Sequence, residues 1–110
     1  MHYVGWSSST GDADWGMRPL LGGADAFPPK LFDTAYYDSP AVDADIATGL
    51  STADPAKRMA AYKHAQEVIW KDAPWVFMVS DINVSGKSKK LRGIYVMPDT
   101  QILTEEAELT

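Results

Sequence analysis

The segment between residues 54 and 74 predicts one long helix with defined ends. Asp54 can accept hydrogen bonds from the free N–H groups of the first turn, and Pro55 lacks the N–H that would stay unpaired there. Pro74 ends the helix, because a proline drives the residue before it out of the helical region. Apolar residues at helical spacing predict a core-facing stripe of Met59, Tyr62, Ala65, Ile69 and Trp70. We therefore expect a helix from Pro55 to about Asp72, with a Lys63–Glu67 pair on its exposed side.

A shorter helix is expected directly before it. Ser39 is a suitable N-cap, and Pro40 takes the first helical position. Val42, Ile46 and Leu50 recur every four residues and predict one apolar face. The next start signal, Asp54-Pro55, bounds this helix.

The rest of the second half predicts strands. Three apolar stretches carry the signal, at residues 75–79, 82–84 and 91–97. The first is continuous and is expected to be buried, whereas Ile82 and Val84 alternate with polar residues as in a half-exposed strand. Gly86 predicts a turn, and Pro98 ends the last strand. The tail from Asp99 onward is polar and acidic, and we expect little of it to pack.

Residues 2–6 form an apolar run that opens abruptly into small hydroxyl and acidic residues. The run predicts a strand, and the glycines, prolines and aspartates after it predict a long irregular stretch over residues 7–38. A loop of this length indicates either a function or packing against a partner. A strand that ends in an aromatic and a polar loop supplies a fixed backbone, an apolar wall and directional hydrogen bonds for a small molecule. The expected ligand-binding residues are Trp6, Ser7, Ser8, Ser9, Thr10 and Asp12.

The four tryptophans divide into two pairs. Trp6 and Trp15 border the polar loop and can stack on a ligand. Trp70 and Trp75 flank Pro74 at core-facing positions, so a structural role is expected for both.

Composition limits the classes of partner. At 110 residues the chain is expected to form a single domain, residues 1–110. The net charge is −5, and the first 54 residues hold eight aspartates against Arg18 and Lys30, so nucleic-acid binding is not expected. The basic cluster at residues 87–92 is typical of a solvated turn. The absence of cysteine excludes disulfides and cysteine-based metal sites, and no apolar run approaches the roughly 18 residues of a membrane span.

Two patterns resemble ligand motifs without completing them. Gly86-Lys87-Ser88 resembles the end of a phosphate-binding loop, but Asp81 stands where the motif needs a glycine. Asp12-x-Asp14 resembles the start of a calcium loop, but Gly16 occupies the next ligand position.

Catalysis is not indicated either. Ser7, Ser8 and Ser9 lack the surroundings of an activated nucleophile. His64 has no second ligand at metal-binding spacing, so it is expected to be a surface residue of the long helix. No catalytic residue, metal or cofactor is expected.

The order of these segments resembles the C-terminal part of the family 5 extracellular solute-binding proteins. The matching motifs are Val4-Gly5-Trp6, Gly11-Asp12-x-Asp14, Arg18-Pro19-Leu20-Leu21, Val42-Asp43, Asp54-Pro55-Ala56-Lys57-Arg58, Asp72-Ala73-Pro74-Trp75, Leu91-x-Gly93 and Met97-Pro98-Asp99. Peptide-binding members carry an aspartate three residues after the tryptophan, which pairs with the ligand's α-amino group. Ser9 stands at that position here, and the loop looks most like the glutathione-binding branch of the family.

The resemblance implies an α/β fold that is a C-terminal fragment of a two-lobed periplasmic-binding-protein fold (type II-like). Two helices would pack on a few strands, after a long irregular N-terminal half, and the chain would complete the first lobe. It implies a non-enzymatic, substrate-binding component of an ABC importer for peptides, with glutathione as the expected ligand. Its partners would be a small peptide ligand and the permease subunits, and its location periplasmic, or extracellular and membrane-anchored in a Gram-positive host.

Two alternatives stay open at this point. The chain can be a free-standing α/β protein-interaction domain whose irregular first half folds on a partner, or, more remotely, a small hydrolase. A chain cut from a longer polypeptide would leave apolar surface bare, which favours self-association.

Overall fold

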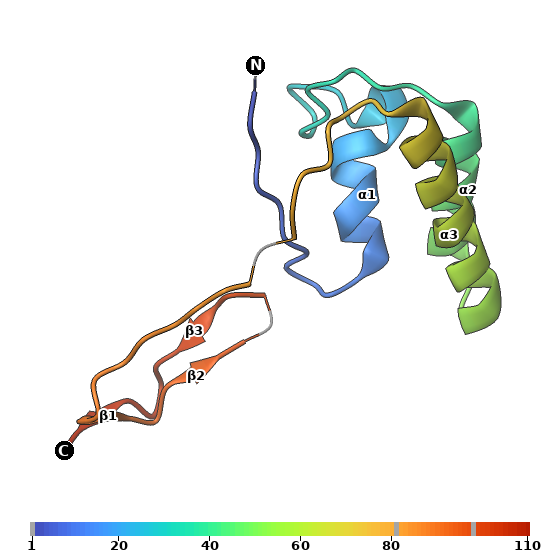
Figure 1. Ribbon diagram of the computed structural model, residues 1–110. Coiled ribbons are helices and arrows are strands. Elements are labelled where there is room, and N and C mark those ends of the chain that lie inside the picture. The colour runs from blue at the N-terminus through green and yellow to red at the C-terminus, as the bar shows by residue number, and fades with distance from the viewer. Residues whose placement is uncertain (1, 81, 98) are drawn as a thin grey trace. The chain divides into compact units, whose positions relative to one another are not determined.

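The computed structural model describes residues 2–80, 82–97 and 99–110. The chain divides into two compact units, Met1–Phe77 and Met78–Thr110. Among the described residues, the first unit holds three α-helices and a short 3-10 helix, and the second holds four two-residue strands (Figure 1). The chain is thus a mixture of helices and small antiparallel sheets.

Helix α3 (Pro55–Asp72) confirms the predicted long helix at both ends. The Asp54 carboxylate accepts the N–H groups of Ala56 and Lys57 at 2.9 and 3.4 Å. Ala73 takes the left-handed conformation (φ 49°), and its N–H bonds to the carbonyl of Ile69. The Lys63–Glu67 pair is present on the exposed side at 3.9 Å.

The buried face of α3 is only partly the predicted one. Tyr62, Ala65 and Ile69 are buried, but Met59 and Trp70 are each 72% exposed, so their prediction as core residues is wrong. These two side chains lie about a third of a turn round the helix from the face that meets its neighbours. Trp70 instead stacks on Phe77, with ring centroids 6.0 Å apart.

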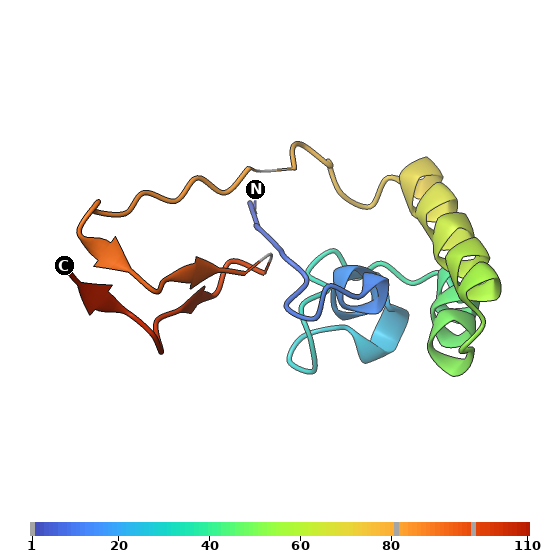
Figure 2. The ribbon, with the colours of Figure 1, turned by 90° about the horizontal axis from the view of Figure 1, so that it is seen from below.

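Helix α2 (Pro40–Ser51) also lies where the sequence predicted it. Pro40 occupies the first turn, although the Ser39 side chain makes no cap hydrogen bond. Val42 and Ile46 are buried, whereas Leu50 is half exposed. Helices α2 and α3 lie side by side in both ribbon views, joined by a short turn (Figures 1 and 2).

Helix α1 (Ala13–Leu21) and the 3-10 helix η1 (Gly23–Asp25) correct the expectation of an irregular stretch over residues 7–38. Asp12 caps the first turn, and burial of apolar side chains outweighs the unfavourable Gly16 and Pro19. Pro19 has no N–H for the carbonyl of Trp15, four residues before it. That carbonyl accepts the indole N–H of Trp6 instead, at 2.7 Å, so the proline leaves no unpaired group there.

The core of the first unit is built by helix against helix, which corrects the expected packing of two helices on strands. Its members come from all three α-helices: Met17, Leu20, Leu21, Val42, Ile46, Tyr62, Ala65 and Ile69. Trp6, Tyr37, Val68 and Trp75 pack against its edge. The structural role expected for Trp75 is therefore confirmed.

Three predicted strands are absent from the described residues. Residues 2–6, 75–79 and 82–84 form no ladder, and apolar side chains in the last two segments are exposed, with Val76 at 88%. A strand needs a neighbour to take its backbone hydrogen bonds. No described residue pairs with these segments, so the apolar pattern alone does not produce a sheet.

The strands of the second unit are short and antiparallel. β1 (Leu91–Arg92) pairs with β4 (Glu108–Leu109), and β2 (Tyr95–Val96) pairs with β3 (Ile102–Leu103). The predicted strand over 91–97 is broken at Gly93 (φ 66°), where a Cβ would collide with the carbonyl of Glu106. The tail supplies β3 and β4, but its side chains from Thr100 onward are exposed, in line with the expectation that little of it packs.

Two smaller predictions concern the ends of these strands. The turn predicted at Gly86 lies three residues later, closed by the N–H of Leu91 and the carbonyl of Ser88 at 3.1 Å. Pro98, the predicted strand end, lies outside the described residues.

Candidate functional site

The loop of residues 7–12 leads from an extended segment into helix α1. Its turn is closed by a hydrogen bond from the N–H of Gly11 to the carbonyl of Ser8, at 3.3 Å. Gly11 has φ 69°, a conformation that residues with a Cβ rarely adopt. The chain therefore reverses tightly within the set of predicted binding residues, directly before Asp12 and the helix that it caps.

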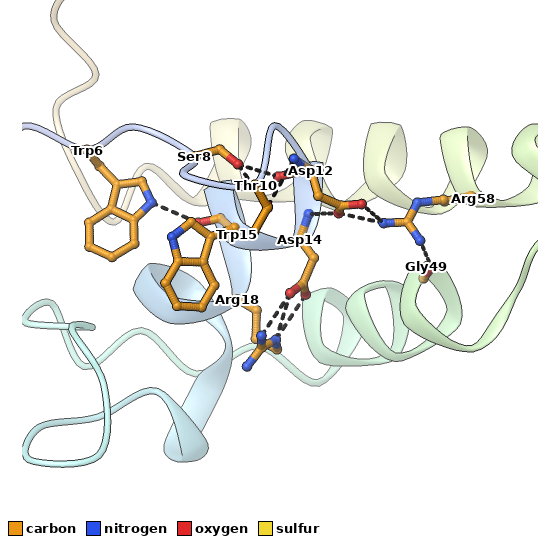
Figure 3. A network of polar contacts seen from close by, with 9 residues as sticks. All are labelled: Trp6, Ser8, Thr10, Asp12, Asp14, Trp15, Arg18, Gly49 and Arg58. Carbon is orange, nitrogen blue, oxygen red and sulfur yellow. Dashed lines mark hydrogen bonds and ion pairs between the residues drawn. The ribbon is translucent and has the colours of Figure 1, made fainter. Parts of the chain in front are cut away.

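Asp12 is the structural centre of this loop (Figure 3). Its Oδ1 accepts the N–H of Asp14 at 2.8 Å and so caps α1. Its own N–H donates to the hydroxyl of Thr10 at 3.2 Å, and its carbonyl accepts the Ser8 hydroxyl at 2.9 Å. Three of the predicted binding residues thus use their polar groups on one another.

The carboxylate of Asp12 also holds an arginine from far along the chain. Nη2 of Arg58, on α3, lies 2.5 and 2.6 Å from the two carboxylate oxygens. Nη1 of the same side chain donates to the carbonyl of Gly49 at 3.1 Å, and the guanidinium lies 5.2 Å from the centre of the Tyr62 ring. Arg58 therefore ties the loop to α2 and α3.

A second ion pair lies within α1. Arg18 donates to both carboxylate oxygens of Asp14, with Nε and Nη2 at 2.9 to 3.0 Å. The Asp14 carboxylate raises the pKa of the Arg18 guanidinium above its ordinary value. The pair fills most of the acceptor capacity of a buried aspartate, so Asp14 is a structural residue.

Trp6 lies at the edge of the core, half buried. Its ring is 6.0 Å from that of Trp15 and 5.3 Å from that of Phe32, centre to centre. The indole N–H is occupied by the Trp15 carbonyl. Trp6 is therefore fixed in place by its polar edge and by two aromatic neighbours.

Ser7 and Ser9 differ from the other residues of the loop. Both are exposed, and neither hydroxyl bonds to any residue that the structure describes. The six predicted residues thus divide into four that hold the loop and its aromatic neighbour in place and two that present free hydroxyl groups. A shallow open groove runs beside Arg58 and Met59 on α3, but none of the six lines it.

The alternative chemistries gain no support from the described part of the chain. No group of three or more His, Cys, Asp or Glu side chains there can hold a metal ion. The two aspartates of the calcium-like pattern each bind an arginine instead. Residues 86–88 lie in an exposed extended stretch and lead into no helix, unlike a phosphate-binding loop.

His64 is a surface residue of α3, as predicted. Its Nδ1 lies 2.6 Å from a carboxylate oxygen of Asp45 on α2. Sequence reasoning missed this pair, as it missed Arg58, because both connect residues on different elements. No helix among the residues with described coordinates is long and apolar enough to cross a membrane.

The amino-acid sequence of the chain is similar to those of known proteins. The chain is 51% identical over 110 residues, its whole length, to the glutathione-binding protein GsiB of Pectobacterium atrosepticum. It is 45% and 46% identical over 109 residues, or 99% of its length, to the proteins of the same name from Salmonella typhimurium and Escherichia coli K12. The chain spans 21% of the length of each of these relatives. No family model matches it. The matches confirm the predicted resemblance to glutathione-binding proteins.

Proposed function

We propose that the chain is the C-terminal part of the substrate-binding component of an ABC importer, and that the intact receptor binds glutathione. The similarity to proteins named for glutathione binding, over the whole of this chain, is the observation that carries the proposal. The relatives carry the names of binding proteins, which supports a role in binding rather than catalysis as part of the proposal. Periplasmic location and contact with the permease subunits belong to the same proposal.

The loop of residues 7–12 is the part of the chain that would contact the ligand. Its free hydroxyls, on Ser7 and Ser9, can each donate and accept a hydrogen bond. Trp6 supplies an aromatic surface whose position is fixed by Trp15 and Phe32. A rigid wall with a few directed polar groups is the usual construction of a small-molecule site.

The charge of the loop fits a particular kind of ligand. The only carboxylate in residues 7–12 is that of Asp12, and it is paired with Arg58. The loop therefore offers no unpaired negative charge to the α-amino group of an ordinary peptide. A γ-linked tripeptide such as glutathione presents its amino group on a different part of the molecule, which suits a neutral, hydrogen-bonding wall.

Exposed apolar residues support the proposal that this chain is part of a longer protein. Val76 and Met78, on the segment predicted to be a buried strand, are 88% and 69% exposed. Large apolar side chains in continuous runs are normally covered by protein. In the proposed receptor, other parts of the polypeptide would cover them and would supply the opposite wall of the site.

The test is calorimetric titration of the intact receptor with glutathione. Removing both free hydroxyls, with Ser7→Ala and Ser9→Ala together, is expected to weaken binding on the order of tenfold, because two neutral hydrogen bonds are lost. Ser51→Ala is the matched control, since it removes an exposed hydroxyl at the end of α2. Wild-type protein that takes up no glutathione would refute the proposed function, and an unchanged affinity in the double variant would refute the assignment of the loop.

A further inference from the structure

The Asp12 carboxylate is bound by the side chain of Arg58, which comes from helix α3 (Figure 3). Among the described residues, no other side chain from outside helix α1 and the loop before it binds this carboxylate. The two residues are 46 positions apart, so their contact joins the loop to a separate element of the fold. The guanidinium is itself held on two further sides, by the Gly49 carbonyl and by the Tyr62 ring. It is therefore a fixed anchor and not a mobile surface cation.

Through its contacts with Asp12, Arg58 is connected to the residues of the loop. The backbone N–H and carbonyl of Asp12 bond to Thr10 and Ser8, which lie on either side of the free Ser9 hydroxyl. A shift of Asp12 would therefore change where Ser9 points. Both charges are about one-third to one-half exposed, so the pair is less screened than a fully solvated one.

From this geometry we infer that Arg58 is a positioning residue for the ligand-binding loop and that it acts through Asp12. The inference concerns ligand affinity only insofar as the proposed function holds, but the ordering of the loop by Arg58 does not depend on it. Among the described residues, Arg58 bonds to Asp12 and Gly49 and to neither of the free hydroxyls, Ser7 and Ser9, that are proposed to meet the ligand.

Three substitutions distinguish positioning of the loop by Arg58 from a general loss of structure. Asp12→Asn removes the ion pair but keeps the helix cap, because asparagine caps as well as aspartate. Arg58→Met removes the guanidinium and keeps much of its apolar stem. Lys63→Met is the matched control, since it removes one positive charge from the same helix at an exposed site without touching Asp12.

The first measurement is amide hydrogen exchange of residues 7–12 in the intact receptor without ligand. Arg58→Met and Asp12→Asn are each expected to speed exchange by roughly fivefold, as for the loss of a partly exposed ion pair. The double variant is expected to match either single variant, because both remove the same contact. Effects that add in the double variant, or wild-type exchange in Arg58→Met, would overturn the inference.

The second measurement is the affinity of the same variants for glutathione. Arg58→Met is expected to weaken binding by about fivefold, and Lys63→Met to leave it unchanged. Arg58→Lys, which keeps the charge and can reach one carboxylate oxygen, is expected to recover at least half of the loss. Equal weakening by Arg58→Met and Lys63→Met, or no recovery with lysine, would contradict positioning through an ion pair. If wild type fails to bind glutathione, the proposed function falls, while the exchange measurement still decides whether Arg58 orders the loop.

Discussion

The contact between Gly49 and Tyr62 predicts that Gly49→Ala destabilises the fold when Tyr62 is present and stabilises it when the tyrosine ring is removed. Gly49 lies inside α2, and a Cβ placed on it would come within 2.5 Å of the end of the Tyr62 ring. Tyr62 is only 4% exposed, so the ring has little room to move. Helix propensity favours alanine over glycine by about 1 kcal/mol, while overpacking of a filled core costs about 1–3 kcal/mol.

Gly49→Ala is therefore expected to lower the free energy of unfolding by about 1 kcal/mol in the wild-type chain. In the background of Tyr62→Ala, which itself is expected to cost about 3–5 kcal/mol, the obstacle is gone. The same Gly49→Ala change should then raise stability by about 1 kcal/mol through propensity alone.

The assay is equilibrium unfolding of the 110-residue chain in urea, followed by circular dichroism, for the four members of this cycle. Gly16→Ala is the control, because Gly16 lies inside α1 and a methyl group added there would meet no heavy atom within 4 Å, so the change should stabilise by about 1 kcal/mol. If Gly49→Ala stabilises the wild type as much as Gly16→Ala does, the ring does not pack on Gly49 and the α2–α3 interface described above is wrong.

Three further predictions follow from burial, charge and the division of the site. Ile69→Ala, at a buried position, should cost about 2–5 kcal/mol in the same unfolding assay, whereas Trp70→Ala next to it should cost less than about 1 kcal/mol; equally large costs for both would support the face predicted from the sequence. Burial raises the pKa of Asp33 above its ordinary value of 3.8, so its charged form destabilises the fold. Asp33→Asn should therefore be more stable than wild type at pH 7, and this advantage should fade as the pH falls through the raised pKa and vanish below 3.8; an advantage that does not change with pH would exclude this cause. The 110-residue chain alone should bind glutathione too weakly for calorimetry, because one wall cannot enclose a ligand; micromolar affinity would show that the site is not shared with other parts of a longer protein.

Helices α2 and α3 could be predicted from the sequence because their start and stop signals are local. Asp54, Pro55 and Pro74 act within one turn of the ends that they define, and the structure follows them. The buried face of α3 was harder to predict, since Met59 and Trp70 are apolar and lie near the right spacing. Which apolar side chains are covered depends on where α1 and α2 lie, and that information is not local.

Helix α1 and the strands were mispredicted for related reasons. Gly16 and Pro19 are unfavourable in a helix. The compensating contact of Trp6 with Trp15 becomes visible only in three dimensions, whereas the Asp14–Arg18 pair has the i, i+4 spacing of a helix and was overlooked. The segment 75–79 has the composition of a strand but no pairing partner among the described residues. Composition therefore predicts which segments can pair, and the fold decides whether they do.

The candidate site was predicted as one group, and the structure separates its members. The polar loop after Trp6 was visible from its composition, but the ion pair between Asp12 and Arg58 joins residues with no sequence relation. Contact of these residues with a ligand remains a prediction, which depends most on Ser9.

The most direct measurement is a titration of the intact receptor and its Ser9→Asp variant with glutathione and with an α-linked tripeptide. The substitution places a negative charge where, by resemblance to the peptide-binding members, an ordinary peptide's amino group would lie. A charged hydrogen bond is worth about 1.5–3 kcal/mol, so the ratio of the two affinities should shift toward the α-linked peptide by roughly 10- to 150-fold. An unchanged ratio would show that Ser9 does not face the ligand and would contradict the proposed site.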